Sequence, residues 1–328
     1  MKCLPGLIAA SLLLAPAALA QTDAPARTPT SLIVDANVPR TADGKPELQG
    51  AVWATNYFPV WDANPMTNQL VVPEAEAKAI VNKMVEGMQG IPDFQIDPEV
   101  HIIIGGTDGL PLVRGERRTR LIVEPADGKV PLTDAARAAI KASAAKGDPM
   151  DDYEQRPNSE RCLVLSGNPP MFVTVSYNRM QIIQTLDYIV IHNENGDEAR
   201  IIPIAERHVG GPQNWFGDAI ARWDGDTLVV ETIRQHPDEV IRGLFGKFPV
   251  TPEAKVIERF TRVAKDELLY QFTVEDPKSY SAPWLAEYSF RAVDTGMYPS
   301  PCHEHNLSLP NILMGARLAD ARGAATAP

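Results

Sequence analysis

The sequence predicts a mainly β protein in which an antiparallel meander of strands closes into a small barrel, after an N-terminal irregular and helical extension. Short runs of Val, Ile, Thr, Phe and Tyr recur between residues 171 and 293, separated by turn residues, which is typical of a meander. The dipeptides Asn195-Gly196 and Asp224-Gly225 each join two such runs and favour hairpin turns, because they accept positive φ angles. About eight strands result, a number that can close into a barrel holding side chains or one small ligand.

The clearest single strand is the segment 268–276. Its apolar residues fall at every second position, close to the period expected of a strand with one apolar and one polar face. The preceding run, 256–263, is joined to it by a short polar loop at Lys265 and Asp266. We therefore expect a third hairpin here.

The N-terminal extension, residues 21–160, is predicted to carry two surface helices and an aromatic arm. Pro73 suits the first turn of a helix over residues 73–88, and Thr133 suits the cap of a helix that follows it. The arm holds a dense aromatic set, Trp53, Tyr57, Phe58 and Trp61. Two roles are open for these rings: packing on the barrel as a plug, or lining a ligand site.

The first twenty residues have the features of a cleaved signal peptide. Lys2 precedes an apolar run that ends in the small-residue pattern Ala18-Leu19-Ala20, which predicts cleavage after Ala20 and a periplasmic or secreted protein. No later segment is apolar enough to cross a bilayer, so we expect no membrane insertion. The expected division is 1–20 signal peptide, 21–160 extension, 161–315 β-barrel domain and 316–328 mobile tail.

Cysteine usage predicts one disulfide. The cleaved segment contains Cys3, which leaves Cys162 and Cys302, and two cysteines in an oxidising compartment are most simply bridged. Without that bridge, Cys302 beside His303 would be a candidate metal ligand or nucleophile.

Charge and missing motifs exclude several classes of function. The formal net charge of −11 argues against nucleic acid or an anionic membrane as a partner. The GxSxG elbow, HExxH, the Walker loop and the dinucleotide fingerprint are all missing from the sequence. We therefore expect no cofactor, and a small organic molecule as the partner.

The densest group of reactive side chains lies in the segment 299–311. His303 and His305 are two residues apart, so on an extended segment both imidazoles point the same way, while Glu304 points opposite. His303 and Glu304 are the candidate catalytic residues, acting as general acid or base. Two alternatives are a structural segment at the barrel rim and a divalent metal site on His303 and His305. A third metal ligand would come from elsewhere, such as His208 or Glu198.

Other polar and aromatic side chains are candidates for contact with the substrate. A polar group facing a barrel interior must be hydrogen-bonded or must meet a ligand or water. The predicted substrate-binding residues are Tyr177, Asn178, Gln181, Arg200, His208 and Trp215.

Several motifs together resemble a family of exported bacterial proteins. They include DGKPELQG at 43–50, RRTRLIVEPADGKVPLT at 117–133, WFGDAIARWDGDTLVVET at 215–232 and CHEHN at 302–306. The resemblance covers most of the chain after the signal peptide, and it implies export and a lipocalin- or calycin-like β body. It brings no reaction with it.

The chain departs from that family at two places. Where the family motif runs CHEGN, this chain has His305 in place of the glycine, and Asp197 and Glu198 stand before Ala199 where the family carries a histidine. Both departures weaken a shared two-histidine metal site and shift weight to Cys302, His303 and Glu304.

The sequence thus predicts an exported small-molecule-binding β-barrel protein. In one interpretation it is an enzyme of lyase, isomerase or hydrolase type, working by cofactor-independent acid/base chemistry in the barrel pocket. The alternatives are a non-catalytic periplasmic binding or carrier protein, and a metal-dependent enzyme.

Overall fold

The computed structural model describes most of the chain after residue 33. The described residues are 34–57, 60–88, 109–146, 150, 152–165, 167–172, 178–238, 241–242, 247–300, 302–304 and 306–326. They belong to one compact unit, residues 34–328. The predicted signal peptide, the predicted strand residues 173–177 and the residues Phe58, Tyr177 and His305 lie outside the described residues.

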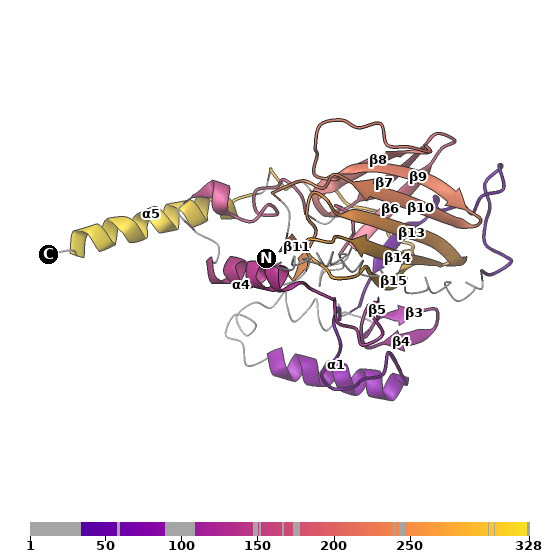
Figure 1. Ribbon diagram of the computed structural model, residues 1–328, viewed down its shortest axis with the longest axis horizontal. Coiled ribbons are helices and arrows are strands. Elements are labelled where there is room, and N and C mark those ends of the chain that lie inside the picture. The colour runs from indigo at the N-terminus through magenta and orange to yellow at the C-terminus, as the bar shows by residue number, and fades with distance from the viewer. Residues whose placement is uncertain are drawn as a thin grey trace, which may run out of the picture. The chain divides into compact units, whose positions relative to one another are not determined.

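The described residues form a mainly β structure with few helices (Figure 1). The strands are β1 Val52–Thr55, β2 Val71–Val72, β3 Leu112–Val113, β4 Glu116–Arg118, β5 Ile122–Glu124, β6 Asn178–Gln184, β7 Tyr188–Asn193, β8 Glu198–Pro203, β9 Asp218–Asp224, β10 Thr227–Ile233, β11 Ile241–Arg242, β12 Phe248–Pro249, β13 Lys255–Ala264, β14 Glu267–Glu275 and β15 Trp284–Val293. The α-helices are α1 Glu74–Met88, α4 Asp134–Lys146 and α5 Ser308–Thr326, and short 3-10 turns lie at Tyr153–Gln155 and Asn195–Asp197.

One antiparallel sheet dominates the structure. Its strand order is β8-β7-β6-β1-β15-β14-β13-β10-β9, with β5 pairing to β15 beside this path. β1 comes from the predicted extension, yet it pairs with β6 on one side and β15 on the other. The N-terminal residues therefore complete the sheet as well as covering it.

The three predicted hairpins are confirmed, with small differences at the turns. β13 and β14 pair up to Ala264 and Glu267, so the loop consists of the two predicted residues. The β9–β10 turn is Gly225-Asp226, one residue later than predicted, with Gly225 at φ +58°. Between β7 and β8 the loop has four residues, because Asp197 also adopts a positive φ beside Gly196.

The inner face of the sheet is filled with aromatic side chains. On β14 and β15 every second residue contributes to the buried core, including Tyr270 and Tyr288, and Phe260 joins them from β13. Trp61, Phe172 and Phe248 reach this face from loops and from β12, and their rings contact one another at centroid distances of 5.1–5.7 Å. The described interior is therefore packed with rings.

The ends of the strand order approach each other without forming a ladder. β8 and β9 meet at one isolated parallel bridge, Ile204–Ala221, with a hydrogen bond from the Ala205 amide to the Ala221 carbonyl. No continuous pairing joins the described parts of these two strands, so the predicted closed barrel is not found. What the structure has is a strongly curved antiparallel sheet.

Both predicted helices are confirmed. The Ala77 amide bonds to the Pro73 carbonyl at the start of α1, and the Thr133 hydroxyl accepts the Ala136 amide at 3.1 Å, as a cap does. α5 is an addition: residues 316–326 of the predicted tail belong to it. Among the described residues, none of the helices combines the length and apolar character needed to cross a bilayer.

Candidate functional site

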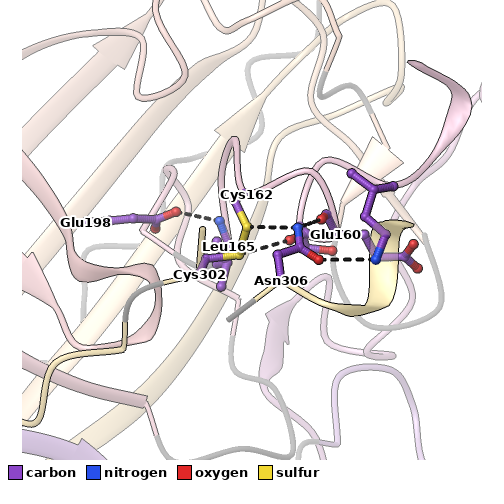
Figure 2. Close-up of a disulfide and its surroundings, with 8 residues drawn as sticks. Glu160, Cys162, Leu165, Glu198, Cys302 and Asn306 are labelled. Atoms are coloured by element: carbon purple, nitrogen blue, oxygen red, sulfur yellow. Dashed lines mark hydrogen bonds between the residues drawn. A yellow bond between two sulfur atoms is a disulfide. The ribbon is translucent and has the colours of Figure 1, made fainter. Parts of the chain in front are cut away.

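The predicted disulfide is present and anchors the C-terminal segment. Cys162 and Cys302 are bonded, and the Asn306 side chain donates to the Glu160 carbonyl at 2.6 Å (Figure 2). The Asn306 side chain also accepts the Leu309 amide, which caps the first turn of α5. This corner therefore joins the loop before β6 to the start of the last helix.

The two candidate catalytic residues lie on this corner and face solvent. His303 and Glu304 are both exposed, within a turn closed by a hydrogen bond from the Asn306 amide to the His303 carbonyl. Their acid/base role stays a prediction. His305, the partner in the alternative metal site, lies outside the described residues.

Glu198, the proposed third metal ligand, is occupied by the backbone. Its carboxylate accepts the Leu165 amide at 2.5 Å and the Gly167 amide at 2.6 Å. It holds the loop that follows Cys162 against the end of β8 (Figure 2). Within the described residues, no group of three or more His, Cys, Asp or Glu side chains could hold a metal ion.

Arg200 lies at the centre of a buried polar group. It donates to both carboxylate oxygens of Glu258, at 3.0 and 2.5 Å, and the Tyr270 hydroxyl donates to Glu258 at 2.8 Å. The Arg200 and Glu258 side chains are 1% and 0% exposed. Burial alone would lower the pKa of Arg200, but attraction to Glu258 outweighs it, so this pKa is raised.

The phenols beside this pair are sealed in the same way. The Tyr270 hydroxyl accepts the Met171 amide at 3.0 Å, and the Tyr288 hydroxyl donates to the Met171 carbonyl at 2.8 Å. Burial raises the pKa of Tyr270 and of Tyr288 well above the ordinary range. The positive charge of Arg200 is therefore neutralised by Glu258 within a buried, hydrogen-bonded group of side chains.

The remaining predicted substrate-binding residues lie in separate places. Gln181 is exposed on β6, on the face opposite the buried Ile182. The backbone of Asn178 starts β6, and its side chain is outside the description, as is Tyr177. Gln181 is thus exposed, whereas Arg200 is buried.

His208 and Trp215 lie on the loop between β8 and β9. His208 stands between two carboxylates, with Nδ1 at 3.3 Å from Asp218 and Nε2 at 3.3 Å from Glu231. Trp215 stacks on His236 with ring centroids 3.8 Å apart. Each imidazole nitrogen faces a different carboxylate, which positions the loop against β9 and β10, but among the described residues the buried His208 Nδ1 makes no hydrogen bond.

A pocket lies beside the aromatic rings, between the segment that follows β1 and the strand β12. It has a volume of about 250 Å³. Its lining residues are Val60, Trp61, Asp62, Ala63, Asn64, Pro65, Met66, Met84, Thr119, Lys247 and Phe248. None of the predicted site residues is among them.

The pocket's floor and one wall are held rigidly. The Val60 and Trp61 carbonyls accept the Leu121 and Ile122 amides, and the Ala63 amide donates to the Gly128 carbonyl. Trp61 and Phe248 are 6% and 0% exposed and continue into the aromatic interior. These contacts hold the two buried rings in place behind the pocket.

Among the described lining residues, the charged side chains are Lys247 and Asp62, and their exposure to water places them at the mouth of the pocket. The Lys247 ammonium lies 3.3 Å from the Asp62 carboxylate, and these side chains are 53% and 38% exposed. The polar Asn64 and Thr119 side chains are turned to the backbone, since Asn64 accepts the Met66 amide and Thr119 donates to the Gln69 carbonyl. Inside the mouth, the surface offered to a ligand is therefore mainly apolar.

The sequence pattern identified one of the residues that line this pocket. Trp61 belongs to the aromatic set for which a ligand lining was one alternative, and Trp53 and Tyr57 of that set are buried. Met84 and Phe248 come from distant parts of the chain, and no local pattern marks them. Only the fold brings these residues to Trp61.

Because comparison with known proteins gives no match, the function is inferred from the geometry of the site. No family model, no curated protein and no solved structure matches this chain. The resemblance to a family of exported bacterial proteins therefore stays a prediction.

Proposed function

We propose that this protein is an exported small-molecule-binding protein that takes a flat aromatic ligand in the pocket beside Trp61. The observation that carries the proposal is the pocket itself, whose walls include two fixed aromatic rings and the flexible side chains of Met66 and Met84. Ligand sites are concave and mostly apolar, with few polar groups. Thioether side chains adapt their shape to a ligand.

The size of the pocket limits the ligand to one or two rings. A dry apolar cavity of about 150 Å³ is enough to bind benzene. The pocket here, at about 250 Å³, lies between that value and the roughly 300–1,000 Å³ of sites for drug-sized ligands. A fused two-ring compound is therefore the best probe.

The proposal includes a lipocalin- or calycin-like closure of the sheet. In a flat sheet, β8 and β13 would lie about 29 Å apart, because five strands separate them at about 4.8 Å per step. Direct contact between Arg200 and Glu258 supports curling of the sheet upon itself. Export is supported by the disulfide, which persists in oxidising compartments.

Binding without turnover is the form of the function that the geometry favours. His303 and Glu304 do not line the pocket, and Arg200 is engaged by Glu258. The acid/base and metal-dependent alternatives rest on the sequence of residues 302–305. Among the predicted classes of function, a binding or carrier protein is the one that requires no reactive side chain outside the pocket.

The test is calorimetric titration with 2-naphthalenemethanol. We expect a Kd of about 10 μM to 1 mM, the range for a two-ring ligand of ordinary efficiency. Met66→Trp places an indole in the pocket from a position that is 40% exposed, so the fold should persist and binding should be lost. The matched control is Met150→Trp, because Met150 is 60% exposed and does not line the pocket. Equal binding by both variants would refute the site.

A further inference from the structure

The pocket's polar groups carry information about the charge of its ligand. The inference below rests on the proposed function and deepens it. Among the described lining residues, Lys247 and Asp62 are the only charged ones, and the Lys247 ammonium lies 3.3 Å from the Asp62 carboxylate. Each neutralises its partner at the mouth.

We propose that the Lys247–Asp62 pair makes the pocket selective for uncharged aromatic compounds. A carboxylate on the ligand would meet Lys247 only by competing with Asp62, and it would stand close to the Asp62 charge. An ammonium on the ligand would meet Asp62 only by competing with Lys247, and it would stand close to the Lys247 charge. Since attraction and repulsion nearly cancel for either sign, a charged substituent gains little at the mouth and still loses hydration.

The rest of the pocket supports the same assignment. Asn64 and Thr119, the polar side chains inside the mouth, hydrogen-bond to backbone groups and are not held out as partners for an ion. The net charge of −11 adds a long-range field that disfavours anions. The same field would attract a cationic ligand. Cations are excluded from the pocket because Lys247 neutralises the Asp62 charge at its mouth.

The pair also predicts how to reverse the selectivity. Lys247→Met leaves Asp62 alone at the mouth, so the pocket should come to prefer a cationic ligand. Asp62→Asn leaves Lys247 alone and should favour an anionic ligand. Both side chains are partly exposed, and each change should alter the matching affinity by about fivefold, the upper range for an exposed charge pair.

The experiment uses three ligands of one shape on the full-length protein. The probes are 2-naphthalenemethanol, 2-naphthoate and 2-naphthylmethylammonium, titrated by calorimetry at pH 7 and constant ionic strength. The wild-type protein should bind the alcohol tightest. Lys247→Met should improve binding of the ammonium alone by about fivefold, and Asp62→Asn should improve binding of the carboxylate alone to a similar extent.

Matched controls separate the local pair from the change in net charge. Lys278 and Glu253 form another exposed pair, 2.5 Å apart with side chains 63% and 52% exposed, and neither lines the pocket. Lys278→Met and Glu253→Gln make the same changes in net charge at that second place. Both should leave the order of the three ligands unchanged.

The outcomes distinguish this inference from the function beneath it. Tighter wild-type binding of either ion than of the alcohol, or variants that keep the wild-type affinities for both ions, would overturn the inference and leave the pocket standing. Lack of binding by all three probes to the folded wild-type protein would reject the proposed function itself. Equal shifts in the control variants would assign the effect to the net charge and would also overturn the inference.

Discussion

Two ion pairs of this protein differ in what surrounds them. Arg200 and Glu258 meet inside the curved sheet with side chains 1% and 0% exposed; the Tyr270 hydroxyl donates to Glu258, and among the described residues Arg200 Nε has no hydrogen-bond partner. Lys247 and Asp62 meet at the mouth of a pocket, with half and more than a third of their side chains in water. An ion pair therefore links strands in the interior of the sheet, and another borders the proposed ligand site.

Burial decides between these two roles. A buried pair that loses one partner leaves an uncompensated charge in a medium that solvates it poorly. An exposed pair is screened by water and contributes little to folding, so either partner can turn toward a ligand. The sealed pair is thus a structural element, and the exposed pair is the one able to respond to a ligand.

The largest expected effect is the loss of one partner of the buried pair. Arg200→Met should lower the free energy of unfolding by about 3–5 kcal/mol, because Glu258 would remain charged without its partner. Urea unfolding followed by circular dichroism measures this change. The double variant Arg200→Met with Glu258→Met should recover most of the loss. A single-variant loss below about 1 kcal/mol would contradict the account of this pair.

The next effect concerns the loop that carries Met171 to the phenols. Cys162 anchors the start of this loop, and replacing both Cys162 and Cys302 by alanine should cost about 2–4 kcal/mol of stability. Hydrogen exchange should also quicken at the Met171 amide, which Tyr270 accepts. Unchanged stability and unchanged exchange would show that the sealed interior does not depend on the disulfide.

Alkaline pH provides a milder test of the sealed interior. Burial raises the pKa of Tyr57, Tyr270 and Tyr288 above the unfolded value of about 10. Their contribution to stability is therefore complete below pH about 10, and it is lost as the pH rises, because only the unfolded chain then releases these protons. Unfolding free energies should fall with pH, by up to about 1.4 kcal/mol per pH unit for each tyrosine.

A spectroscopic titration checks the same point. The buried phenols, those of Tyr57, Tyr270, Tyr280 and Tyr288, should ionise only on unfolding. Tyrosinate absorbance that appears in a single step at ordinary pH, with circular dichroism unchanged, would show that the interior is open to solvent.

The smallest expected effect is at the exposed pair. Lys247→Met and Asp62→Asn should each change the free energy of unfolding by less than about 1 kcal/mol, because water replaces the lost partner. The urea measurement used for Arg200→Met applies here unchanged. A loss near that of Arg200→Met would erase the contrast between the two pairs.

Much of the fold could be predicted from local patterns. Alternation along the strand now seen as β14, the glycines at positions 196 and 225, and Thr133 before α4 each identify an element because its cause lies within a few residues. The disulfide followed from the number of cysteines in a compartment that favours bridges. Closure of the sheet into a barrel is not found among the described strands, and it depends on how β8 and β9 pair, which no local pattern specifies.

The site was harder to predict for a physical reason. Arg200 was predicted to contact a substrate, but it pairs with Glu258, 58 positions away, and nothing local shows that these two residues satisfy each other. Lys247 and Asp62 are separated by 185 positions. A pocket assembled from such distant segments has no signature in any one of them, and only Trp61 stood out.

The central claim is that a ligand enters beside Trp61 and not inside the curved sheet. Methionine methyl groups report both places, because Met66 and Met84 line the pocket while Met171 and Met180 are buried in the interior. A titration of ¹³C-methyl-labelled protein with 2-naphthalenemethanol should shift the Met66 and Met84 signals saturably and leave those of Met171 and Met180 in place. Shifts confined to Met171 and Met180 would contradict the account and place the ligand within the sheet.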